Sequence, residues 1–137
     1  MKILQILEIE NDSIDTGHGW NQNVYGFNVV TEDDVIELRI SNEQSCCETF
    51  GYFWCNDDPQ DFVGATIERV SITNTALNTK IMKAHNFSTI DEDDNMMFVN
   101  FETNKGTLQF VLYNSHNGYY GHEAYVKSRK MEHKETL

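Results

Sequence analysis

The chain has 137 residues, and its 22 acidic and 10 basic side chains give a formal charge of −12. This charge disfavours direct binding to nucleic acid or to an anionic membrane surface, because both are themselves negative. Hydrophobic residues make up 39% of the chain and aromatic residues 12%, which predicts a packed core rather than disorder. The length fits one domain, and no apolar run in the sequence is long enough to cross a membrane.

The cysteines are typical of a reducing compartment. Cys46 and Cys47 are adjacent and rarely bridge in that arrangement, and the third, Cys55, makes the count odd. The apolar start of the chain is short and is followed at once by Glu8 and Glu10, which argues against a signal peptide. We therefore expect a cytoplasmic protein with reduced, structural thiols.

Alternating apolar and polar residues predict strands in chain order at 3–9, 25–30, 35–40, 67–72, 96–102, 108–113 and 120–126. The polar stretch 11–23 is predicted to be a loop. A helical turn is expected at Pro59, capped by Asp57 or Asp58, and a partial helix over 76–84.

These elements predict a mostly β fold. The expected architecture is a single-domain antiparallel sandwich, or a bent sheet or barrel, with one or two short helices. The β-rich domain is expected to span residues 1–126. The charged tail, 127–137, lacks an apolar face and is expected to be a frayed helix or disordered.

Residues 108–126 hold the densest group of potential binding side chains. They are interpreted as a hairpin whose turn lies at Asn117-Gly118, because this dipeptide favours tight turns. Tyr120 shares a face with Ala124 and Val126 and is predicted to enter the core. The predicted ligand-binding residues lie in the turn or on the opposite face: His116, Asn117, Tyr119, Glu123 and Tyr125. Cross-strand aromatic pairing without any ligand is the alternative.

Three acidic runs, at residues 32–34, 57–58 and 91–94, form a second candidate surface. The candidate partner-binding residues come from two segments: Asp57, Asp58, Asp91, Glu92, Asp93 and Asp94. Together they could imitate a phosphate track on a basic partner. The alternative is that the charges only confer solubility.

Catalytic and metal sites find little support in the sequence. A metal site would need Cys46 or Cys47 to combine with His116 or His122, and adjacent cysteines point to opposite faces of a strand. A Cys46–His122 nucleophile pair has no supporting spacing, and His122 and Glu123 are neighbours that face opposite ways. We therefore expect no enzyme, no cofactor and no metal.

The stretch from Val35 to Val126 resembles a family of small, mostly uncharacterised proteins encoded in phages and prophages. The matching segments are Cys46-Cys47-Glu48, Asp57-Asp58, residues 62–67 and residues 115–120. The family usually has a serine directly before Asn-Gly-Tyr-Tyr, whereas here His116 intervenes. The resemblance implies a phage setting and no known activity.

Short acidic phage proteins often act against host defences, which gives the expected function by analogy. We expect a non-enzymatic inhibitor that binds a nucleic-acid-binding defence protein in the cytoplasm of an infected cell, as an anti-CRISPR does. One alternative is a sponge that sequesters a nucleotide immune signal, with the ligand at a subunit interface of a homo-oligomer. Another is a structural or assembly phage protein. No nucleic acid, membrane or cofactor is expected as a partner.

Overall fold

The structure is a computed structural model, and it describes residues 1–137 except 16, 18, 20, 45–47, 88–93 and 116–119. Strands hold 62% of the structure and helix 8%, which confirms the mostly β prediction. Within the described part of the chain, no helix has the length and apolar character that a membrane crossing requires.

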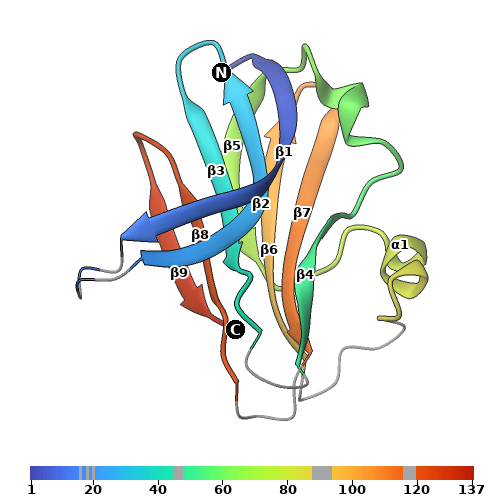
Figure 1. The fold of residues 1–137 in the computed structure, drawn as a ribbon. Coiled ribbons are helices and arrows are strands. Elements are labelled where there is room, and N and C mark those ends of the chain that lie inside the picture. Colours follow the sequence, from blue (N-terminus) through green and yellow to red (C-terminus); the bar gives the residue numbers. More distant parts are fainter. Residues whose placement is uncertain (16, 18, 20, 45–47, 88–93, 116–119) are drawn as a thin grey trace.

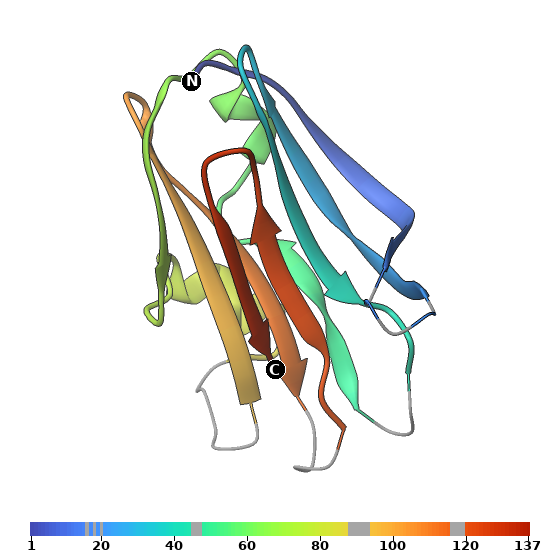
Figure 2. The same ribbon diagram turned by 90° about the vertical axis from the view of Figure 1, so that its left-hand side faces the viewer.

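Two antiparallel sheets form a sandwich (Figures 1 and 2). The five-stranded sheet has the order β1 (Ile3–Asp15), β2 (Asn21–Thr31), β3 (Val35–Ser41), β8 (Glu123–Lys127) and β9 (Glu132–Thr136). The four-stranded sheet has the order β4 (Thr49–Trp54), β7 (Gly106–Ser115), β6 (Asp94–Thr103) and β5 (Ile67–Thr73).

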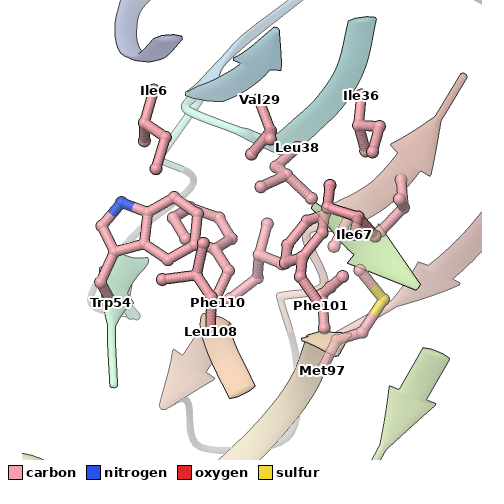
Figure 3. Close-up of a cluster of buried hydrophobic side chains, with 14 of the residues drawn as sticks. Ile6, Val29, Ile36, Leu38, Trp54, Ile67, Met97, Phe101, Leu108 and Phe110 are labelled. Carbon is pink, nitrogen blue, oxygen red and sulfur yellow. The ribbon is translucent and has the colours of Figure 1, made fainter. Parts of the chain in front are cut away.

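The main core lies between the sheets, as the alternation along each strand predicts. Ile36, Leu38 and Ile40 on β3 are fully buried and face the four-stranded sheet. Phe101 and Phe110 meet them from β6 and β7 (Figure 3). Burial of these apolar side chains supplies the main driving force for the fold.

The two short helices lie where the sequence predicts them. The 3-10 turn η1 (Pro59–Phe62) is capped by Asp58, whose carboxylate accepts a hydrogen bond from Gln60 N at 2.9 Å. Helix α1 (Thr79–Ala84) is capped by Asn78. Its residue Met82 belongs to a second buried cluster with Phe53 and other residues of the four-stranded sheet.

The predicted hairpin at 108–126 is wrong, because its two strands belong to different sheets. β7 pairs with β4 and β6, whereas β8 pairs with β3 and β9. Alternation along a strand indicates which face is buried, but it does not identify the neighbouring strand. The segment between them therefore joins the two layers. Its turn at Asn117-Gly118 lies outside the described residues.

The prediction for the tail is also wrong. Its second half forms β9, which pairs with β8 from Glu123↔Thr136 to Lys127↔Glu132. Leu137 is 5% exposed, and its N and O atoms are both hydrogen bonded to His122. Backbone pairing at a sheet edge needs no apolar stripe, so the sequence pattern gave no indication of this strand.

β1 and β2 form a bent hairpin, and both strands are longer than predicted. β1 continues to Asp15 and β2 starts at Asn21, so most of the predicted loop at 11–23 is strand. A register shift lies between Ile9 and Asp12. Beyond it, the hairpin crosses in front of β3, β8 and β9 in Figure 1, and Asp12 reaches Arg39 of β3.

Gly26 of β2 permits close contact between β2 and β3 near this bend. A Cβ atom at Gly26 would lie 1.9 Å from the carbonyl oxygen of Leu38, and φ is +156°. Gly26→Ala should therefore lower the free energy of unfolding by about 3 kcal/mol, measured by chemical denaturation. Asn21→Ala, at the exposed start of the same strand, should change it by less than about 0.5 kcal/mol. Equal effects of the two substitutions would contradict this account.

Candidate functional site

A buried guanidinium organises the outer face of the five-stranded sheet. The Arg39 side chain is 2% exposed although it points away from the main core. Its Nε donates to Asp12 Oδ2 at 3.0 Å, Nη1 to the Phe27 carbonyl at 2.7 Å and Nη2 to Asn28 Oδ1 at 2.7 Å. These bonds tie β1 and β2 to β3, because an unpaired buried charge would cost several kcal/mol.

A pocket of about 200 Å³ lies between the bent hairpin and this face of the sheet. Its lining comes from β1, β3, β8 and β9: Asp12, Ser13, Ile14, Glu37, Tyr125, Lys127, Glu132 and Lys134. Here Glu37, Lys127 and Glu132 form one cross-strand row. We call this cavity the hairpin pocket.

Tyr125 is the predicted ligand-binding residue that lines the hairpin pocket. It is 7% exposed, and within the described part of the chain its hydroxyl makes no hydrogen bond. Burial raises the pKa of Tyr125 above its usual range, and the carboxylates of Glu37 and Asp12 act in the same direction against Arg39. The phenol therefore stays protonated and can both donate and accept a hydrogen bond.

The other predicted ligand residues do not join it in the described structure. Glu123 is on the same strand, but its carboxylate accepts from Thr136 Oγ1 at 2.7 Å and lies 3.6 Å from Lys134 Nζ. His116, Asn117 and Tyr119 lie outside the described residues.

The prediction that Tyr120 enters the core is wrong, because Tyr120 is 37% exposed. β8 starts only at Glu123, so strand alternation does not extend back to residue 120. Ala124 and Val126, which are inside the strand, are fully buried as predicted.

His122 forms a buried polar cluster that the sequence did not reveal. Its Nδ1 lies 2.8 Å from the Ser41 carbonyl oxygen and 2.9 Å from Ser41 Oγ, and its Nε2 lies 3.3 Å from Glu48 Oε2. The ring stacks on Phe50 at 3.9 Å. Glu48 is 74 residues away in the chain, so no local motif links it to His122.

This cluster resembles a Ser-His-acid triad in composition but not in chemistry. Nδ1 lies as close to the Ser41 carbonyl oxygen, which can only accept a hydrogen bond, as it does to the Ser41 hydroxyl. The side chains of His122 and Glu48 are 1% and 0% exposed, so substrate cannot reach them. The cluster therefore links the end of β3 to the residues directly before β4 and β8.

The described thiol, Cys55, is buried and donates to the Asn78 carbonyl at 3.4 Å. Burial raises its pKa, which keeps it as an unreactive thiol and fits the predicted structural role. Cys46 and Cys47 lie outside the described residues. Among the residues that the structure describes, no three His, Cys, Asp or Glu side chains are grouped to hold a metal ion.

Exposed carboxylates line the edge of the sandwich formed by β1 and η1. Gln60 Nε2 donates to the Ile6 carbonyl at 3.1 Å, which holds η1 against β1. Neither β1 nor residues 57–64 contain a lysine or arginine. The acidic edge, as we call it, comprises Glu8, Glu10, Asp15, Asp57, Asp58 and Asp61.

The predicted acidic surface is divided between two ends of the molecule. Asp57 follows Asn56, whose side chain bonds Thr107 at the start of β7, whereas Asp94 pairs with Ser115 at its end. Ten residues of strand separate these points by roughly 30 Å. Asp91, Glu92 and Asp93 lie outside the described residues, as does the side chain of Asp94.

Comparison with protein families matches residues 4–126 to a profile described as "Domain of unknown function (DUF7448)". No curated protein and no solved structure matches the chain.

Arg39→Met should lower the free energy of unfolding by about 2–4 kcal/mol, since it leaves Asp12 and the Phe27 carbonyl without their partner. The matched control is Arg69→Met. Arg69 also bonds a carboxylate, Glu102, at 2.9 Å, but both side chains are exposed, so a loss below about 1 kcal/mol is expected. Urea denaturation of both variants measures the difference. Similar losses would show that the Arg39 network is not a structural anchor.

Tyr125, which is buried, and Tyr25 and Tyr52, which are half-buried, predict loss of stability at alkaline pH. Burial raises the pKa of Tyr25 to about 12, and raises those of Tyr52 and Tyr125 further. Tyrosines of the unfolded chain ionise at about pH 10. The contribution of these tyrosines to the free energy of unfolding is therefore complete below that pH, and it is lost as pH rises through the folded pKa values. At about pH 11, native protein should show less tyrosinate absorbance near 295 nm than urea-unfolded chain. Equal absorbance would contradict the prediction.

Proposed function

The chain belongs to the DUF7448 family, and on that premise we propose that it is a non-enzymatic binding protein that inhibits a host defence effector. The acidic edge is the observation that carries this proposal. It places exposed carboxylates along β1 and η1, with no lysine or arginine within these segments, and such a surface can occupy a basic nucleic-acid channel. Charge complementarity of this kind speeds association and selects the partner. The protein would act in the cytoplasm of an infected cell.

The phage setting rests on the sequence resemblance described above. An inhibitor made during infection must find its target quickly, and long-range attraction between opposite charges raises association rates. A strongly acidic small domain suits that requirement.

The geometry of the described residues also favours binding over catalysis. Catalytic acids and bases must reach a reacting group through contact or one water molecule. The His122–Glu48 pair is buried and saturated by its neighbours, and in the exposed pair His133–Glu135 both residues lie on the same edge strand, β9. The hairpin pocket is accessible, but Asp12 and Lys134 in its lining are already ion-paired with Arg39 and Glu123.

The nucleotide-sponge alternative receives less support from the hairpin pocket. Asp12, Glu37 and Glu132 place three carboxylates in its lining, against the ammonium groups of Lys127 and Lys134. A phosphate there would be repelled by nearby acids and would have to compete with Glu123 for Lys134. Tyr125 is too deeply buried to offer its ring face for stacking on a base.

The proposal predicts that the protein restores phage plating on bacteria that carry one defined DNA- or RNA-targeting defence system. A panel of such strains is scored by plaque counts. Neutralising the acidic edge with Glu10→Gln, Asp15→Asn, Asp57→Asn and Asp61→Asn should reduce protection at least about tenfold, because ion contacts with the basic partner are lost. Stability should hardly change, since these carboxylates are exposed.

The matched control removes the same number of charges elsewhere, with Glu43→Gln, Glu68→Gln, Glu102→Gln and Glu135→Gln. This variant should protect as well as the wild type. Equal loss of protection in both variants would show that protection depends on net charge and not on the acidic edge. Absence of protection on every strain would overturn the proposed function.

A further inference from the structure

We infer that the hairpin pocket receives one lysine or arginine side chain of the basic partner, an inference that rests on the proposed function. The pocket opens beside Asp12, within the segment of β1 that carries Glu10 and Asp15 of the acidic edge. A basic surface drawn to that edge therefore brings its cations next to the pocket. Buried basic anchors of this kind commonly dominate binding energy at protein interfaces.

The carboxylates of the pocket converge from three separate strands. Asp12 comes from β1, Glu37 from β3 and Glu132 from β9. Asp12 already accepts from Arg39, but Glu37 lies 3.7 Å from that guanidinium, and Glu132 makes no ion pair within the described residues. Glu37 and Glu132 thus retain acceptor capacity for a guanidinium or ammonium group.

The hydroxyl of Tyr125 supplies an independent indication of a ligand. It belongs to a side chain more than nine-tenths buried, it lines the pocket, and no described residue bonds it. The hydroxyl oxygen is not itself sealed from solvent, so an N–H donor that enters the pocket can bond it in place of water. A neutral phenol oxygen can accept this bond through a lone pair.

Two lysines also line the pocket, and their positions decide which ligand charge it favours. Lys134 is drawn towards Glu123, with 3.6 Å between Nζ and Oε2. Lys127 is exposed and lies between Glu37 and Glu132 in the cross-strand row. An incoming cation would displace Lys127 towards solvent and take its place between these two glutamates.

The size of the pocket limits the occupant to a single side chain. A volume of about 200 Å³ is below the range of roughly 300–1,000 Å³ typical of sites for drug-sized ligands. It is sufficient for one arginine or lysine side chain. The planar guanidinium of arginine has enough N–H donors to bond Glu37, Glu132 and Tyr125 together.

The test uses N-acetyl-arginine amide as the probe and N-acetyl-citrulline amide as its uncharged analogue, titrated into full-length protein and followed by NMR. We expect saturable shifts at the amides of Tyr125, Lys127 and Glu132 with the arginine compound only. Equal binding of the citrulline compound, or no saturable shift with arginine, would overturn the inference. Neither result bears on protection in the plaque assay, which depends on the acidic edge.

Single substitutions then separate a cation site from an anion site. Glu132→Gln and Tyr125→Phe should each weaken arginine binding about two- to fivefold, and Lys127→Met should strengthen it by a similar factor. Glu135→Gln, on the same strand but outside the pocket, is the matched control and should leave the affinity unchanged. Weaker binding after Lys127→Met would overturn the inference, because it would mean that the lysine contributes to ligand binding.

Discussion

The buried guanidinium of Arg39 is the constraint on which the outer face of this sandwich depends. A charge removed from water must find several acceptors, and Arg39 finds them in Asp12 of β1 and in Phe27 and Asn28 of β2. Satisfying them requires the first hairpin to bend across the sheet, and the bend in turn creates the hairpin pocket. A polar requirement on one residue thus shapes a surface that apolar packing alone would leave flat.

The two faces of the five-stranded sheet have separate roles. The inner face is apolar and supplies stability through Leu38, Ile40 and their partners across the sandwich. The outer face carries the charged rows and the unbonded hydroxyl of Tyr125. The His122 cluster is sealed inside, whereas this outer face and the acidic edge are accessible to a partner. Both are suited to recognition of a cationic partner.

The acidic edge and the hairpin pocket would act at different ranges. The edge presents exposed carboxylates that attract over about a Debye length, roughly 8 Å at physiological salt. The pocket acts only on contact, where partial removal of water strengthens each polar interaction. Attraction without an anchor gives fast but weak association, and an anchor without attraction gives slow association. Their proximity on β1 allows one partner to use both.

The sequence by itself determined the fold class, the strand faces and the two helical turns. Alternation at residues 35–40 and caps such as Asp58 are local properties, and local sterics and solvation are enough to specify them. It also identified Tyr125 as a binding candidate, although for a hairpin that does not exist. Only the tertiary structure decided that β7 and β8 belong to different sheets and that the tail pairs as β9. It alone brought Asp12 to Arg39 and Glu48 to His122, because such contacts join residues distant in the chain whose proximity depends on the packing of the whole sandwich.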